Sequence, residues 1–399
     1  MKPQRLRATG SLMATANLAE SVGRQVWLRS PLWDTVCLAF CWLPFYLWVV
    51  FGLKLGAEAW GLAALDDAAN RQALVLATTA ALGITYIHRH YTLLLVYGDS
   101  ATFKARAKQY LLAPVVLLAV IVSARFGKGV TLIKLGPLEV TSWGMIVAVG
   151  TTWNIWHTLQ QRYGILRAYG GRAQHGLETR AHARRDFWLL WSWVAVVVVL
   201  VLGYQRRTFS QHKSTWYIEQ QLGPYFATPV ATALSAAVVL ATLVLTLNWL
   251  RHELNAAVPL KQRSARVVFL FSTILLLSVF AWHGPIVGYL CFGVAHALEY
   301  LAFVHHFTQR KYVGGADNSV PMGSGVPAGV AATLFSQPAL SVPLLIGGLI
   351  AAYLLLRSYR GTDAYVVYYI TTSFLHFLYD GWIWKVRTQP IAKPLGISA

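Results

Sequence analysis

Charge is scarce in this sequence. Only 12% of its 399 residues are Asp, Glu, Lys or Arg, which is about half the share found in a typical soluble domain. Cysteine is also rare, because Cys37, Cys41 and Cys291 are the only three, and none belongs to a CxxC or CxxCH motif. The sequence therefore argues against a disulfide framework, a zinc site built from thiolates and covalently attached haem.

Acidic residues are the scarcer of the two charge types, and the formal net charge is +19. No nucleic-acid-binding motif accompanies this excess of Lys and Arg, so we expect no nucleic acid partner. The basic residues lie mostly in short loops between apolar runs, such as 162–186. This distribution is typical of the cytoplasmic loops of membrane proteins, where anionic lipid attracts positive charge.

Hydrophobic residues make up 56% of the chain and recur in runs of helix length. This pattern predicts an all-α fold, a polytopic integral membrane bundle of about ten transmembrane helices embedded in the lipid bilayer. The predicted spans are 32–53, 72–92, 110–124, 141–160, 187–204, 228–250, 266–282, 285–304, 339–356 and 364–385. With both termini in the cytoplasm, most of the 34 Lys and Arg fall on the cytoplasmic side. No cleavable signal peptide is visible, and we expect a bacterial inner membrane.

The predicted organisation has one membrane domain. Residues 1–31 form a basic cytoplasmic arm, 32–385 a single transmembrane helical domain, and 386–399 a cytoplasmic tail. Within the domain, residues 307–336 are rich in Gly, Pro and Ser, which predicts a flexible cytoplasmic loop. No internal repeat of solenoid length is present.

Ionisable and amide side chains gather in the even-numbered predicted spans, toward their cytoplasmic ends. We call this group the polar layer; its members are His88, His90, Asn154, His157, Gln161, His296, Glu299, His305, His306, His376 and Asp380. His296 lies nine residues before His305, and at 1.5 Å per residue it sits about 13 Å above that end of its helix. Because ionisable groups inside a membrane are costly, their common depth indicates a functional site.

The spacing within the layer predicts a metal site. His376 and Asp380 are four residues apart and His296 and Glu299 three, so each pair shares a helix face, as in helical carboxylate–histidine centres. His88 and His90 instead point about 200° apart on a regular helix. The predicted ligands are His88, His90, His157, His296, Glu299, His305, His306, His376 and Asp380. The residues predicted to support them are Asn154, Gln161, His252, Tyr300 and Tyr379.

Imidazole and carboxylate without thiolate suit non-haem iron, and the residues suffice for one or two ions. Zinc, copper and haem are alternatives. His305 and His306 lie two and a half turns from His296, so all three can bind one ion only if the helix breaks between them. Glu299 and Asp380 are predicted either to bind metal or to orient a ligating histidine through its second ring nitrogen.

The segments "IHRHY", "HALEYLAFVHH" and "HFLYD" resemble the membrane-bound histidine-rich non-haem iron oxygenases, which include lipid desaturases, hydroxylases and carotenoid-modifying enzymes. The resemblance implies a metal-dependent oxidoreductase that uses dioxygen on a hydrophobic lipid or isoprenoid chain. Basic residues near the cytoplasmic mouth, among them Arg310, Lys311 and Lys385, could receive an acidic electron-donor protein.

Three other functions fit the same residues. Chains of His, Asp and Glu also form proton relays, which would make the protein a proton-coupled transporter. His157 and His376 could be axial ligands of a b-type haem. A zinc ion in the polar layer would instead predict a membrane hydrolase or transferase.

Overall fold

The computed structural model describes residues 26–55, 68–135, 138–172, 180–205, 223–256, 258–313, 329–385 and 389–396. These residues are almost entirely helical, which confirms the predicted all-α class. The long helices are α4 (Ala68–Tyr97), α6 (Ala107–Phe126), α7 (Ser142–Arg172), α8 (Arg180–Val199), α11 (Pro229–Leu254), α12 (Leu260–Thr308), α14 (Pro338–Leu356) and α15 (Asp363–Ile383). The shorter elements are α2 (Pro31–Trp33), η1 (Asp34–Ala39), α3 (Leu43–Leu47), η2 (Trp48–Gly52), α5 (Ser100–Ala105), η4 (Leu200–Gln205), η5 (Gln309–Val313), α13 (Val330–Ser336), η6 (Arg357–Tyr359) and α16 (Gln389–Ala392). Strands β1 (Thr131–Leu135) and β2 (Leu138–Thr141) form an antiparallel hairpin between α6 and α7.

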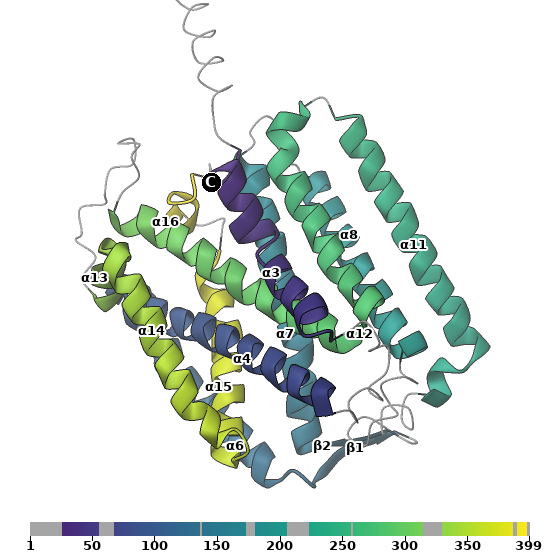
Figure 1. Ribbon diagram of the computed structural model, residues 1–399, viewed down its shortest axis with the longest axis horizontal. Coiled ribbons are helices and arrows are strands. Elements are labelled where there is room, and N and C mark those ends of the chain that lie inside the picture. Colours follow the sequence, from purple (N-terminus) through teal and green to yellow (C-terminus); the bar gives the residue numbers. More distant parts are fainter. Residues whose placement is uncertain are drawn as a thin grey trace, which may run out of the picture.

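Helix α12 contains two of the predicted spans, 266–282 and 285–304, joined at a sharp bend. Gly284 has φ 78° and ψ 175°, a backbone conformation open to glycine, and Pro285 starts the second limb. Figure 1 shows the two limbs diverging from this bend. At the bend, a Cβ on Gly288 would lie 2.5 Å from the ring of Phe280, so the close approach of the limbs also requires glycine.

Four helix segments meet in the middle of the molecule: α4, α7, α15 and the second limb of α12, which begins at Pro285. Helix α14 packs on α4, and α6 packs on α15. On the other side, α8 packs on α7 and α12, and α11 packs on α8 at the right edge of Figure 1. The four central segments are the ones that carry the polar layer.

Five helices in the described part of the chain are long and apolar enough to cross a membrane: Ala107–Phe126, Ala181–Gly203, Pro229–Leu254, Leu260–Tyr312 and Val342–Tyr359. The segments Pro31–Ala39 and Leu43–Gly52, bent by 50°, make a sixth if they count as one span. The expected count of ten is therefore confirmed only in part. Helices α4, α7 and α15 fall outside the count because their polar side chains lower their hydropathy, and α12 unites two predicted spans.

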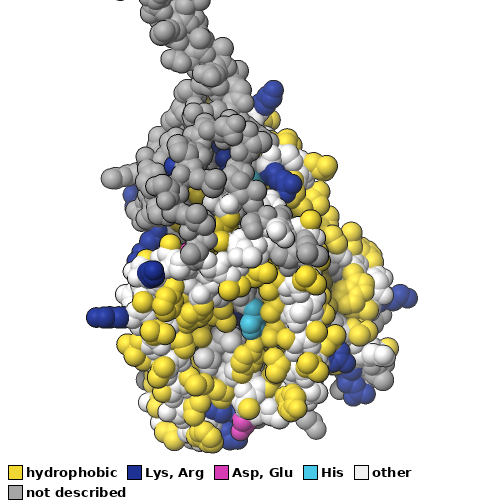
Figure 2. All heavy atoms as spheres, turned by 90° about the vertical axis from the view of Figure 1, so that its left-hand side faces the viewer, with side chains coloured by type: hydrophobic (Ala, Val, Ile, Leu, Met, Phe, Trp, Pro, Cys, Tyr) yellow, Lys and Arg dark blue, Asp and Glu magenta, His cyan; other side chains and the backbone are white. Residues whose placement is uncertain are grey.

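The outer helices expose apolar side chains. On α11, Val230 is 68% and Leu247 64% exposed, and on α6 Leu111 is 61% and Val115 64% exposed. Figure 2 shows one face of the molecule covered mostly by hydrophobic side chains, with most Lys and Arg toward its margins. Contiguous apolar surface of this kind requires an apolar environment or a partner, and surrounding lipid provides the former.

The predicted arm, loop and tail are only partly described, and their described parts hold more helix than expected. The flexible loop 307–336 is too long, because α12 and η5 continue to Val313 and α13 begins at Val330; residues 314–328 lie outside the described residues. Of the basic arm, only 26–31 are described. The tail, described over 389–396, packs Ile391 and Leu395 against Phe307.

Asp99, just after the C-terminal end of α4, connects that helix with α5 and η5. Its Oδ1 accepts hydrogen bonds from the backbone N–H groups of Ala101 at 3.0 Å and Thr102 at 3.2 Å, which caps α5. Its Oδ2 accepts from the ammonium of Lys311 and, at 2.7 Å, from the hydroxyl of Tyr312. Burial alone would raise the pKa of Asp99, but Lys311 and the other donors outweigh it and hold this pKa below its ordinary value.

We expect Asp99→Asn to destabilise the protein at neutral pH and to matter less in acid. Because the folded-state pKa of Asp99 is depressed, its ionised form stabilises the fold fully above the ordinary carboxyl pKa of 3.8. That stabilisation is lost as the pH falls through the lower, folded-state value. Thermal unfolding of the unsubstituted protein and of Asp99→Asn between pH 7 and pH 3 measures this stabilisation. A stability difference between the two proteins that does not shrink in acid would contradict the role given to Asp99.

Candidate metal centre

Each of the four central helix segments contributes one buried histidine. His88 comes from α4, His157 from α7, His296 from α12 and His376 from α15, and none is more than 8% exposed. We call these four residues the histidine cluster. The Nε2 atom of His376 lies 3.1 Å from Nε2 of His88, 3.1 Å from Nε2 of His157 and 3.4 Å from Nε2 of His296.

Hydrogen bonding does not account for this convergence. A neutral imidazole nitrogen offers either one proton or one lone pair, so Nε2 of His376 can satisfy only one of its three neighbours well. Protonating the rings would place like charges in contact inside the protein, at high cost. Four nitrogens bound to one ion at 2.0–2.1 Å in tetrahedral geometry would lie about 3.3 Å apart. The three separations from Nε2 of His376 lie close to that value.

A network of hydroxyl and carboxyl groups lies behind His376. Its Nδ1 is 2.7 Å from Oγ1 of Thr92. The hydroxyl of Thr92 donates to Oδ1 of Asp380 at 3.0 Å, and the hydroxyl of Tyr300 donates to the same oxygen at 3.0 Å. If Nδ1–H of His376 donates to Thr92, the lone pair of Nε2 faces the cluster. Outer hydrogen bonds of this kind orient a metal-binding histidine and fix its tautomer.

Thr92→Val should therefore weaken metal binding about 10- to 100-fold, the usual effect of removing an outer partner of a ligating histidine. Valine keeps the shape of threonine and removes the hydroxyl, so the tautomer of His376 loses its support. Titration of the metal-free protein with metal ions gives the affinity, and Thr92→Ser is the control that should bind like the unsubstituted protein. Equal affinity in Thr92→Val would exclude this role.

Asp380 lies at the edge of the cluster. Its Oδ2 is 3.6 Å from Nε2 of His157 and 3.8 Å from Nδ1 of His376. Two groups have ligand atoms within 4.8 Å of one another: His88, His296 and His376, and His157, His376 and Asp380. The four histidines and Asp380 thus form two overlapping groups of donors that share His376.

Glu299, a predicted ligand, is placed elsewhere. Its carboxylate accepts two hydrogen bonds from Arg162, from Nη2 and, at 3.2 Å, from Nε, and both side chains are fully buried. A carboxylate held on both oxygens by a guanidinium is not free to bind a metal ion. The amide of Gln161 donates to the backbone oxygen of His296 at 3.1 Å, so this predicted supporting residue does contact the cluster's own helix.

The structure also keeps four predicted histidines apart from the cluster. Both ring nitrogens of His90 are engaged, by Tyr86 O at 2.7 Å and Tyr368 Oη at 2.8 Å. His305 contacts the hydroxyl of Tyr91 at 3.1 Å. The ring of His306 packs near Trp33, and His252 is exposed at the end of α11. The helical period explains these positions, because two or nine residues along a helix change face or depth.

The predicted supporting tyrosines divide in the same way. Tyr300 reaches Asp380, as described above, whereas the hydroxyl of Tyr379 bonds to the backbone oxygen of Tyr110 at 3.0 Å. Asn154 donates to the hydroxyl of Tyr289 at 2.8 Å rather than to a histidine.

Thr92 and Arg162 are the two residues of the site that the sequence analysis missed. Thr92 is four residues from His88 and therefore lies on the same helix face. That spacing could have predicted that Thr92 lies near the histidines. Arg162 falls in the segment 162–186, which was interpreted from the sequence as a basic loop. Gly170, a residue type that commonly ends a helix, is a local signal that the helix is longer, and α7 does continue past Gly170.

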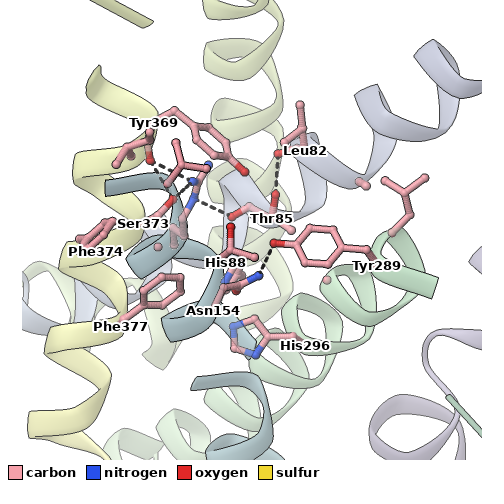
Figure 3. A pocket seen from close by; sticks show the side chains of 18 of the residues that line it. Leu82, Thr85, His88, Asn154, Tyr289, His296, Tyr369, Ser373, Phe374 and Phe377 are labelled. Carbon is pink, nitrogen blue, oxygen red and sulfur yellow. Dashed lines mark hydrogen bonds between the residues drawn. The ribbon is translucent and has the colours of Figure 1, made fainter. Parts of the chain in front are cut away.

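A cavity of about 350 Å³ reaches the histidine cluster between α4, α7, α12 and α15. His88 and His296 line it, and most of the remaining lining is aliphatic or aromatic, including Phe374 and Phe377 (Figure 3). The Asn154–Tyr289 pair lies beside the two histidines in this view. The cavity gives an apolar molecule direct access to two of the converging imidazoles.

No family model, curated protein or solved structure matches this chain. The resemblance of three segments to the histidine-rich oxygenases therefore stays a prediction. What can be inferred about the chemistry rests on the donor atoms, their separations and the cavity beside them.

Proposed function

We propose that this protein is a membrane-embedded, metal-dependent oxidoreductase with one non-haem iron ion, acting on a lipid or isoprenoid chain with dioxygen. The observation that carries the proposal is the convergence of four Nε2 atoms from four helices at one end of an apolar cavity. The apolar outer surface supports a membrane location. The bacterial inner membrane remains the expected compartment.

One ion is favoured over two because only one carboxylate is left for the site. Arg162 holds Glu299, and a two-iron centre in a helical bundle uses several bridging and terminal carboxylates. Asp380 and four neutral imidazoles suffice for a single ion of iron, copper or zinc. Haem is disfavoured, because three imidazoles have Nε2 within 3.4 Å of Nε2 of His376. The flat porphyrin ring of a haem would not fit between side chains that close.

Oxidation is favoured over hydrolysis by the cavity lining. None of the described residues that line it is Asp or Glu, so no carboxylate faces the cavity as a general base. Bound iron would supply the redox chemistry that activates dioxygen. The chain itself would position the ion through the histidine cluster, orient His376 through Thr92, and exclude water with Phe374 and Phe377.

Zinc is the second candidate ion, because the three Nε2 separations measured from His376 lie close to the ligand spacing of a tetrahedral site. Iron would also require electrons, and the basic side chains of Arg310 and Lys385 at the cytoplasmic mouth make an acidic electron-donor protein part of the proposal.

Elemental analysis of detergent-purified protein tests the function, together with a visible spectrum of the same sample. The expected result is one iron per chain without a Soret band, and dioxygen uptake that depends on added reductant and on lipid. Stoichiometric zinc would redirect the proposal to hydrolysis or group transfer. Folded protein that binds no transition metal in titration would refute the centre.

A further inference from the structure

Arg89 is a buried cation whose charge no acidic side chain balances in the described part of the chain. It is 3% exposed. Its Nε donates to the backbone oxygen of Thr85 at 3.1 Å, and Nη1 donates to the backbone oxygen of Tyr369 at 3.3 Å and to Oγ of Ser373. Its guanidinium carbon lies 4.0 Å from the centre of the Tyr369 ring. The remaining nitrogen, Nη2, has no hydrogen-bond partner among the described residues.

Such a side chain is costly without a counter-charge, because a buried charge is tolerated when it is paired and fully hydrogen-bonded. Other buried arginines of this chain follow that rule: Arg162 pairs with Glu299, and Arg266 pairs with Asp186. Arg89 differs from them in having only neutral partners; Arg162 also has one terminal nitrogen without a partner, but Glu299 balances its charge. A bound anion would supply what is missing.

Arg89 also lines the cavity that reaches the histidine cluster. In Figure 3 its partners Tyr369 and Ser373 lie at one end of the view and His296 at the other. On α15, Ser373 and Tyr369 precede His376 by three and seven residues, which places them about 5 to 10 Å from it along the helix axis. A molecule held at Arg89 could therefore extend to the cluster through one continuous space.

We propose that this cavity takes a substrate with a carboxylate group, which pairs with the guanidinium of Arg89 while the hydrocarbon chain points toward the histidine cluster. The assignment of this molecule as substrate rests on the proposed function, whereas its binding rests on Arg89 alone. A carboxylate fits better than a phosphate, because Arg89 is the only Arg or Lys among the described lining residues and a single charge balances it. Its partners leave one guanidinium nitrogen for the ligand.

The size of the cavity limits how much of the substrate it encloses. At about 350 Å³, the cavity lies at the small end of the range of ligand pockets, roughly 300–1,000 Å³. The cavity therefore encloses the carboxylate and the first part of the chain. A longer fatty or isoprenoid acid would extend beyond it, and the reacting carbon would lie in the half of the molecule nearer the carboxylate.

Equilibrium dialysis of the full-length, detergent-purified protein with radiolabelled decanoate tests this proposal. Decanoate is a medium-chain fatty acid, and decanol is the uncharged control ligand. We expect saturable decanoate binding at one site per chain, weakened roughly ten- to hundredfold in Arg89→Gln, the range for losing hydrogen bonds to a charged group. Decanol should bind both proteins equally. Arg357→Gln, at an exposed arginine after α14, should bind decanoate like the unsubstituted protein.

Equal decanoate affinity in Arg89→Gln would overturn the proposal, as would tighter binding of decanol than of decanoate to the unsubstituted protein. If Arg89→Gln does not fold, Arg89→Lys keeps the charge, and its loss of the planar guanidinium should still weaken decanoate binding measurably. Metal content is determined on the same samples. Arg89-dependent binding without metal would refute the proposed function and leave this inference standing, whereas metal without Arg89-dependent binding would refute the inference alone.

Discussion

Replacing His376 with alanine is expected to abolish stoichiometric metal binding, with a loss of affinity greater than the 10- to 100-fold that follows from removing an outer partner. His376 has the largest expected effect because its Nε2 lies within 3.4 Å of the Nε2 atoms of the other three histidines. Removing it also disconnects Thr92 from the centre. Metal analysis of the purified variant and a titration of the metal-free protein give the result.

His90→Ala is the matched control for this experiment. His90 belongs to the same short segment as His88, is also largely buried in an aromatic setting, and directs both ring nitrogens to Tyr86 and Tyr368. We expect it to retain one metal ion per chain. Full metal content in His376→Ala would remove α15 from the centre, and loss of metal in His90→Ala would show that the polar layer binds metal in another arrangement.

Breaking the buried pair of Arg162 and Glu299 is expected to cost about 3–5 kcal/mol of stability, because each single substitution leaves an uncompensated charge in the interior. Both side chains are fully buried, and Arg162 also lies over the ring of Phe269 at 5.0 Å. The double variant Arg162→Met with Glu299→Leu should lose much less, since apolar residues of similar volume often replace buried ion pairs with little loss. Unfolding of the three variants in mixed micelles forms a double-mutant cycle.

A further variant, Glu299→Gln, separates the structural role of Glu299 from its predicted role as a ligand. Glu299→Gln should lose stability yet bind one metal ion per chain with unchanged affinity where it remains folded. The exposed ion pair of Arg125 and Asp363 provides a control, because Asp363→Asn removes a charge at the surface and should change stability little. If Glu299→Gln lost its metal while remaining stable, Glu299 would be a ligand after all.

The depth of the site could be predicted from the sequence. Counting 1.5 Å per residue from the predicted helix ends places His88, His157, His296 and His376 in one layer. In the structure their side chains do meet, although α7 continues to Arg172. The shared face of His376 and Asp380 follows from the helical period in the same way. The break between the two limbs of α12 was also predicted, because glycine and proline adjoin there at 284 and 285.

The choice among neighbouring polar residues could not be predicted. His88 and His90 have the same local signal, yet only His88 faces the other histidines. Glu299 shares a face with His296, but Arg162 from α7 takes its carboxylate. In each case the outcome depends on a side chain that is remote in the sequence and on how far each helix is rotated about its axis.

By itself, the sequence determined the all-α class, the apolar outer helices, and a layer of histidines and carboxylates at one depth. These properties depend on composition, helical period and rise, which are local. Only the tertiary structure decided which four histidines converge, which carboxylate remains near them, and that Arg89 lines the cavity without an acidic partner among the described residues. Helix packing sets these features, because the rotation of each helix is chosen by the fit of all its neighbours together.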